Sequence, residues 1–193
     1  MEPFLTSDQQ RALLKIASQA VKATALGQPP NRLDLSQLSP ELMRKGASFV
    51  TLTNQGDLRG CIGSIEARLP LAEDVQAHAV DASSRDYRFS PISENELAQI
   101  AVEISVLTPP IPLPYQEPSQ LLGKLRPGID GLLLQYQMHR STFLPQVWEK
   151  LPDPAQFLTA LCLKARLPGD IWQREVLDIQ TYQVFSFHSP TLL

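Results

Sequence analysis

Hydrophobic residues follow two different spacings along the chain, and each spacing predicts a type of secondary structure. In some segments the apolar residues recur at i, i+3 and i+4, which gives an amphipathic helix one apolar face. In others apolar and polar residues alternate, as they do in a strand with one face in the core. The predicted helices span about 6–27, 40–46, 69–84 and 153–165, and the predicted strands about 47–53, 58–65, 100–107, 132–134 and 176–187.

The first two predicted strands are joined by Asn54-Gln55-Gly56-Asp57, a sequence typical of a tight turn, so they form a predicted hairpin. Side chains alternate across a strand, which places Val50 and Leu52 on one face of the first strand and Phe49 on the other. In the second strand the same rule turns Leu58 and Ile62 toward the core. Arg59 and Cys61 then share the opposite face.

The predicted strands come as hairpins or as single strands separated by helices, a pattern that favours a mainly antiparallel sheet flanked by helices. The fold class is therefore α+β, in a single domain over residues 1–193. Thr108–Pro118 contains five prolines, which remove backbone donors and disfavour helix at each preceding residue. We expect this segment to be an extended connection over the surface and a boundary within the fold.

Composition is that of an ordinary globular protein, because 43% of the residues are hydrophobic and 19% are charged. Seventeen basic and twenty acidic residues give a net charge of −3, without the basic stripe that binds phosphates, so nucleic acid is not an expected partner. No apolar run is long enough to span a bilayer, and the N-terminus lacks the pattern of a secretion signal. A soluble, cytoplasmic protein without membrane contact is expected.

The two cysteines lie in different surroundings, and in a protein without a secretion signal both are expected to be thiols. Cys162 shares a helical stripe with Leu158 and Leu161 and is predicted to lie in the core. Cys61 has two interpretations. The adjacent glycines and Arg59 suit a reactive thiol, whereas a free cysteine is commonly a small buried apolar side chain.

A base or a metal site near Cys61 is not evident from the sequence. His78, His139 and His188 are all more typical of packed or surface histidines than of catalytic ones. Neither Glu103 nor Asp130 stands at a ligand spacing from a cysteine or a histidine, so no metal and no other cofactor is predicted. The glycines on either side of Cys61 lack the lysine and hydroxyl residue of a phosphate-binding loop.

Two strings in the predicted hairpin resemble the signature of the AMMECR family, which in bacteria is component A of the AmmeMemoRadiSam system. The strings are Lys45-Gly46-Ala47-Ser48-Phe49-Val50-Thr51-Leu52 and Leu58-Arg59-Gly60-Cys61-Ile62-Gly63-Ser64. Similar patterns recur at Arg88-Phe89, Leu125-Arg126-Pro127-Gly128, Asp130-Gly131-Leu132 and Thr142-Phe143-Leu144-Pro145, among others, and cover most of residues 44–185.

The resemblance implies a larger and a smaller subdomain, with a cleft near the cysteine. It also implies a shared pathway or complex with Memo-like and radical S-adenosylmethionine proteins, and it implies no defined reaction. The residues that it marks as candidate ligand-binding positions are Arg59, Gly60, Gly63, Arg88, Asp130 and Thr142.

Two hypotheses about function follow. In the first, the protein is an enzyme or enzyme component in which Cys61 is a nucleophile or anchoring thiol, Arg59 or Arg88 holds an anionic group, and Glu103 handles a proton. Cys61 is then expected to border a concave pocket with one of these arginines nearby. In the second, the protein is a binding or scaffold module that presents the Arg-Gly-Cys-Ile-Gly surface to protein partners.

Overall fold

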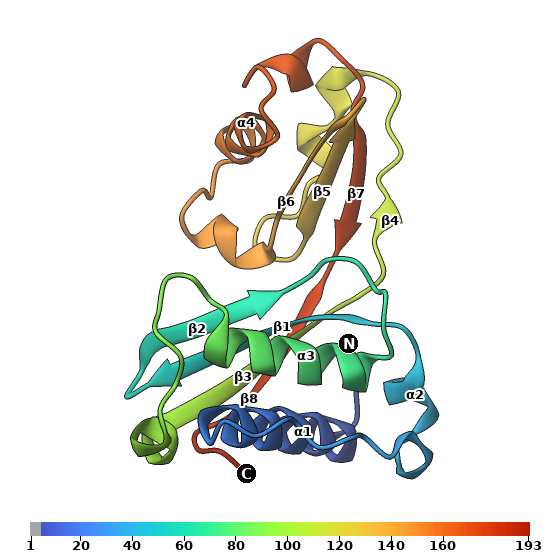
Figure 1. Cartoon of the computed structure of the whole chain (residues 1–193). Helices are drawn as coiled ribbons and strands as arrows, with labels where there is room; N and C mark the ends of the chain where they lie inside the picture. Colours follow the sequence, from blue (N-terminus) through green and yellow to red (C-terminus); the bar gives the residue numbers. More distant parts are fainter. Residues whose placement is uncertain (1–4) are drawn as a thin grey trace. The chain divides into compact units, whose positions relative to one another are not determined.

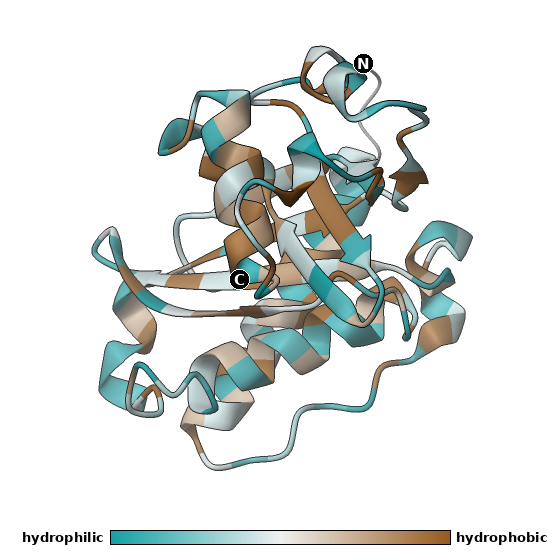
Figure 2. Ribbon diagram, turned by 90° about the horizontal axis from the view of Figure 1, so that it is seen from above, coloured by the Kyte–Doolittle hydropathy of each residue, from teal (hydrophilic) through white to brown (hydrophobic). Residues whose placement is uncertain are grey.

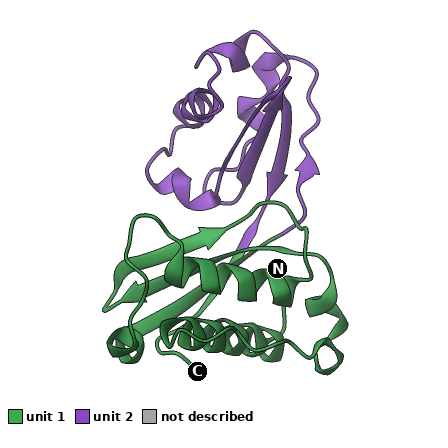
Figure 3. Cartoon of the chain, viewed as in Figure 1, with its two compact units in different colours: residues 1–107, 185–193 green, residues 108–184 purple. Residues whose placement is uncertain are grey.

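The computed structural model describes residues 5–193, which form two compact units (Figures 1 and 3). Unit 1 comprises the described residues up to Leu107 together with Phe185–Leu193, and unit 2 comprises Thr108–Val184. Each unit has its own four-stranded sheet and its own hydrophobic core. The α+β class with antiparallel pairing is confirmed, and the strands are divided between two sheets.

Unit 1 is built on a sheet with strand order β2-β1-β3-β8. Its elements are α1 (Ser7–Ala25), η1 (Leu35–Gln37), α2 (Pro40–Met43), β1 (Ala47–Asn54), β2 (Asp57–Gly63), α3 (Leu71–Ser84), η2 (Glu94–Gln99), β3 (Ile100–Leu107) and β8 (Val184–Ser189). The central strand β1 is antiparallel to both β2 and β3. Helix α1 begins with a reciprocal capping box between Thr6 and Gln9, which satisfies backbone donors of its first turn.

The core of unit 1 lies between the sheet and the neighbouring helices α1 and α3, which cover one face of the sheet. Val50 and Leu52 are fully buried there, while Phe49 on the opposite face is half-buried, as predicted. Figure 2 shows that the helices carry both hydrophobic and hydrophilic residues, as amphipathic helices do.

The predicted orientation of Leu58 is wrong, because β2 contains a bulge. Gly60 pairs with Leu52, but Leu58 pairs with the next residue, Thr53, so Arg59 is an extra residue on β2. One inserted residue reverses the face of everything before it. Leu58 therefore points away from the core and is 44% exposed.

Unit 2 has a sheet with strand order β4-β7-β5-β6 and a core under α4. Its elements are β4 (Ile111–Pro112), η3 (Pro118–Gln120), η4 (Leu122–Lys124), β5 (Gly131–Tyr136), β6 (His139–Phe143), η5 (Pro145–Glu149), α4 (Pro154–Lys164), η6 (Ile171–Gln173) and β7 (Asp178–Tyr182). The proline-rich segment is extended and largely exposed, as predicted, and two of its residues pair with β7.

The last predicted strand is two strands, since β7 belongs to the second sheet and β8 to the first. The predicted core position of Cys162 is confirmed. Its side chain is fully buried among the apolar residues of unit 2, and burial raises the pKa of the thiol to about 11.

Candidate functional site

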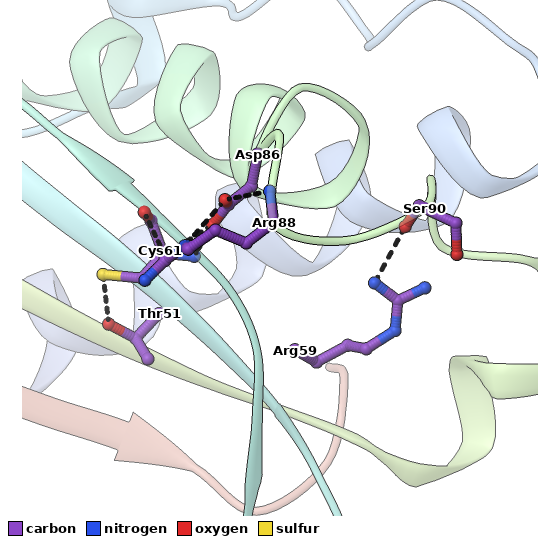
Figure 4. Close-up of polar contacts among 6 residues, drawn as sticks. All are labelled: Thr51, Arg59, Cys61, Asp86, Arg88 and Ser90. Atoms are coloured by element: carbon purple, nitrogen blue, oxygen red, sulfur yellow. Dashed lines mark hydrogen bonds and ion pairs between the residues drawn. The ribbon is translucent and has the colours of Figure 1, made fainter.

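Cys61 lies on β2, an edge strand of the first sheet, and its backbone is fixed from outside the sheet. The N–H of Cys61 donates to Asp86 Oδ2 at 2.9 Å, and its carbonyl accepts from Arg88 Nη2 at 3.3 Å (Figure 4). Both partners come from the loop that follows α3. The two side chains therefore form the hydrogen bonds that the backbone of a further strand would form at this edge of the sheet.

Asp86 and Arg88 form a close ion pair under the strand edge. Arg88 Nε donates to Asp86 Oδ1 at 2.9 Å and Arg88 Nη2 to Asp86 Oδ2 at 2.6 Å. The Asp86 carboxylate is buried, and its bond to the Arg88 guanidinium holds the pKa of that carboxyl well below its usual range despite burial. Asp86 is therefore an anion whose role is to position Cys61 and Arg88.

The thiol of Cys61 is half-buried and has a hydroxyl partner within the sheet. Thr51 is the cross-strand neighbour of Cys61, and Thr51 Oγ1 donates to Cys61 Sγ at 3.2 Å. Glu103 pairs with Thr51 on the other side of β1. Directly opposed residues point to the same face of a sheet, so Cys61, Thr51 and Glu103 form one row on the face opposite the helices. Thr51 separates the carboxylate from the thiol.

Arg59 is held in the fold by several hydrogen bonds, and its predicted role in ligand binding remains a prediction. Its Nε donates to Glu96 Oε1 at 2.7 Å, and its other nitrogens donate to Glu96 and to the carbonyls of Ser90 and Pro91. The Arg59 guanidinium lowers the pKa of Glu96 to about 2. Figure 4 shows Arg59 extending toward Ser90, away from the Cys61 thiol. Arg59, the extra residue of the bulge, thus links β2 to the segment before η2 and to Glu96 within η2.

The Phe89 ring lies close to both arginines of this region. The guanidinium carbon of Arg88 is 5.4 Å from the centre of the Phe89 ring, and that of Arg59 is 5.9 Å away. Both distances are within the range of a cation–π contact. The aromatic ring therefore helps to hold both cations in place around the hairpin.

The two glycines beside Cys61 are required by close packing. A Cβ on Gly60 would lie 2.1 Å from the carbonyl oxygen of Ala82 in α3, and a Cβ on Gly63 would lie 2.3 Å from the Phe49 ring. Neither distance is sterically allowed. The predicted role of these residues in ligand binding remains a prediction, and their packing role explains why the positions are glycine.

Asp130 and Thr142, the other candidates, belong to unit 2 and have partners there. Asp130 is buried and forms a two-point ion pair with Arg126. Thr142 Oγ1 donates to the carbonyl of Leu132 at 2.8 Å and lies 2.7 Å from Tyr182 Oη. They therefore stand outside the row on the first sheet.

The described partners of His78 and His139 lie outside the row formed by Cys61, Thr51 and Glu103. His78 Nδ1 lies 3.2 Å from Asp74 Oδ2 and 3.4 Å from Ser48 Oγ, on the helix-covered side of the sheet. His139 Nδ1 lies 2.8 Å from the carbonyl of Ala165 in unit 2, and His188 is exposed on β8. Across residues 5–193, no three histidine, cysteine or acidic side chains group closely enough to hold a metal ion.

Sequence reasoning did not predict the contacts that Thr51 and Asp86 make with Cys61. Asp86 could have been found from its place two residues before Arg88, since an aspartate in a loop often accepts bonds from the residues that follow it. Here the Arg88 N–H donates to Asp86 Oδ1 at 3.2 Å. Thr51 carries no local signal, because its contact with Cys61 depends on the bulge.

The fold and the site together define an α+β protein of two antiparallel sheets with a cysteine hairpin clamped at its outer edge. The chain belongs to the AMMECR1 family, whose model matches residues 14–187. A protein of Methanothermobacter thermautotrophicus is 37% identical over 185 residues, which cover 95% of this chain and 96% of that protein. A protein of Aeropyrum pernix is 39% identical over 181 residues, which cover 89% and 75% of the two chains.

A solved structure has the same fold over nearly the whole chain. The uncharacterized protein PH0010 from Pyrococcus horikoshii has a TM-score of 0.82 and 29% sequence identity, covering 97% of this chain and 95% of that one. Within residues 5–193, no helix is both long and apolar enough to cross a membrane.

Proposed function

We propose that the protein is an enzyme or enzyme component in which Cys61 acts as a nucleophile or as a thiol that anchors a ligand. The observation that carries this proposal is the hydrogen bond from the Thr51 hydroxyl to the Cys61 sulfur. A hydroxyl donor stabilises a thiolate more than a thiol, and the thiolate is the reactive form. A cysteine that served only to fill space would need no such donor.

Each neighbour of the thiol has a distinct role in this proposal. Thr51 stabilises the thiolate, and Glu103 receives or returns a proton through the Thr51 hydroxyl or through water, because the carboxylate stands two strands from the sulfur. Asp86 fixes the backbone of Cys61. Arg88 supplies a nearby positive charge, and its side chain is 42% exposed, so it can also meet an anionic group of a ligand.

The family resemblance supplies the proposed partners. We place the protein in the cytoplasm beside Memo-like and radical S-adenosylmethionine proteins. An iron–sulfur cluster would belong to the partner, because the two cysteines of this chain are too few to hold one.

Alkylation of the native protein tests the proposed role of Thr51. Thr51→Val removes the hydroxyl and keeps the shape, so Cys61 Sγ loses the donor that favours the reactive form of the sulfur. We expect the rate of reaction with iodoacetamide at Cys61 to fall about 2- to 10-fold, which is the range set by the net free energy of one hydrogen bond. Thr51→Ser, which keeps the hydroxyl, should react at nearly the wild-type rate. Peptide mapping by mass spectrometry measures both rates.

Cys162 is the internal control in the same sample, because burial raises the pKa of its thiol to about 11. It should stay unmodified until denaturant is added. An equal rate at Cys162 and Cys61 in the native protein contradicts the reactive-site proposal. An unchanged rate at Cys61 in Thr51→Val contradicts the role of Thr51 and removes the observation that carries the proposal.

A binding or scaffold module is the second candidate, and the exposure of Tyr87 favours it. This side chain is 95% exposed between Asp86 and Arg88, which are both held in place by their ion pair. Exposed tyrosines on rigid backbone are frequent anchors in protein interfaces. A protein with an unreactive Cys61 that loses a co-purifying partner on Tyr87→Ala would have this second function.

A further inference from the structure

A small cavity in unit 2 is lined by an arginine that a buried carboxylate holds in place. The cavity has a volume of about 250 Å³, and its lining includes Arg126, Asp130, Pro109, Ile111, Tyr182 and Gln183. All of these residues belong to Thr108–Val184, so the cavity is contained within one unit. It is separate from the row of residues around Cys61.

The turn before β5 sets the position of Arg126. Gly128 has a φ of +75°, a conformation that favours glycine, and the N–H groups of Ile129 and Asp130 both donate to the carbonyl of Arg126. The turn brings the Asp130 carboxylate back to the Arg126 guanidinium. Arg126 Nε donates to Asp130 Oδ2 at 2.7 Å and Nη2 donates to Oδ1 at 2.6 Å.

This ion pair is asymmetric in its exposure. The side chain of Asp130 is 3% exposed, whereas that of Arg126 is 54% exposed. A guanidinium has five N–H donors, and Asp130 takes only the edge formed by Nε and Nη2. The outer edge, formed by Nη1 and the second N–H of Nη2, has the geometry that accepts a second carboxylate in two-point contact.

Thr108, Thr181 and Gln183 also line the cavity, and its apolar surface comes from Pro109, Ile111 and Tyr182. Pro109 and Ile111 come from the proline-rich segment, and Ile111 is 64% exposed. The Tyr182 ring packs over Gly131, where a Cβ would lie 2.5 Å from the ring. The Tyr182 hydroxyl is turned to Thr142 and to the carbonyl of Phe143, so this residue offers its ring rather than its hydroxyl to the cavity.

We infer that this cavity binds a small carboxylate with a short apolar body, with the carboxylate on the outer edge of Arg126 and the apolar part against Pro109 and Ile111. A water molecule takes about 30 Å³ of liquid, so the volume suits a ligand of roughly ten non-hydrogen atoms or fewer. The buried Asp130 orients the guanidinium before the ligand arrives, which lowers the entropic cost of binding. This inference is independent of the proposed role of Cys61.

Sodium butyrate is the probe for the test, added to the full chain at constant ionic strength and followed by ¹H–¹⁵N NMR. We expect saturable shifts at Ile111, Gln183 and Thr181, which all line the cavity, with a Kd on the order of 1 mM, typical of a ligand of this size. The neutral analogue butyramide should bind at least about 10-fold more weakly, since it cannot form the charged two-point contact.

Two pairs of substitutions separate the site from the stability of the fold. Ile111→Glu leaves the ion pair intact at an exposed position, places a like charge at the cavity, and should weaken butyrate binding by about 10-fold. Ile111→Lys should keep or improve it. Arg126→Met should abolish binding, and Arg174→Met is its control, because Arg174 pairs with Asp170 at the same i, i+4 spacing with both side chains 60% exposed.

Three results would overturn the inference. They are the absence of saturable shifts at the cavity residues up to 50 mM butyrate (about 50 times the expected Kd), equal binding of butyramide, and equal loss of binding in the Arg174 and Arg126 variants.

Discussion

Replacing Asp86 by asparagine is expected to lower the free energy of unfolding by about 2–3 kcal/mol at pH 7. The carboxylate is buried and accepts bonds from the Cys61 N–H and from two nitrogens of Arg88. Breaking a fully buried ion pair costs about 3–5 kcal/mol, and the half-exposed Arg88 side chain reduces that figure because solvent can screen its charge. Urea unfolding of the two proteins measures the difference.

The pH dependence of the same comparison identifies the charge as the cause. The folded-state pKa of Asp86 is lowered far below its ordinary value of 3.8, chiefly by the hydrogen bond from Arg88. The stability that this carboxylate contributes is therefore fully present above about pH 4 to 5, and it is lost as the pH falls through the folded-state pKa. The gap between the wild type and Asp86→Asn should shrink steadily from pH 5 to pH 2.

Glu96 does not obscure this comparison. Its pKa is also lowered, to about 2, by Arg59, so the stability of both proteins falls over the same acid range. That loss is common to the two proteins and cancels in their difference. Asp170→Asn is a control for removing a carboxylate from an exposed ion pair and should change the free energy of unfolding by less than about 0.5 kcal/mol. A gap that stays constant with pH contradicts the assigned charge.

Local spacing was sufficient to predict the regular parts of the fold. The strand Ile100–Leu107 has the predicted limits, and the helix from Ser7 to Ala25 lies within the predicted range 6–27. These elements have strong periodic patterns of their own. The division of the last predicted strand between two sheets was not predicted, because the apolar pattern of residues 176–187 continues through Gln183 while the pairing partners change.

The neighbours of Cys61 show most clearly where sequence reasoning stops. If the pairing continued from Asn54 and Asp57 along both strands without a bulge, Cys61 would pair with Val50, a core residue. The extra residue at Arg59 shifts the pairing by one, so that Cys61 meets the Thr51 hydroxyl instead. Nothing in the local sequence requires a bulge at this position. The hydrogen bond between Thr51 and Cys61, on which the proposed function rests, could therefore be found only from the strand pairing in the structure.

The glycine before Cys61 explains how the bulge is tolerated against a helix. Gly60 follows the extra residue, pairs with Leu52 and faces α3, so the strand comes to rest on the backbone of that helix. Because no side chain separates them, the clamp formed by Asp86 and Arg88 can reach Cys61 from the end of α3. The close approach of Gly60 to α3 thus allows Asp86 and Arg88 to fix the backbone of Cys61.

Gly60→Ala is accordingly expected to destabilise the protein by about 3 kcal/mol, the upper end of the usual cost of overpacking. The new Cβ would lie 2.1 Å from the carbonyl oxygen of Ala82, a backbone atom that moves only if α3 or β2 moves. Urea unfolding measures the loss, and the alkylation rate of Cys61 reports whether β2 has shifted away from the clamp. Gly123→Ala is the matched control, since its Cβ would meet no atom within 4 Å, and its free energy of unfolding should stay within about 0.5 kcal/mol of the wild type. If Gly60→Ala is as stable as Gly123→Ala and Cys61 reacts at the wild-type rate, then the contact with α3 does not hold the hairpin in position.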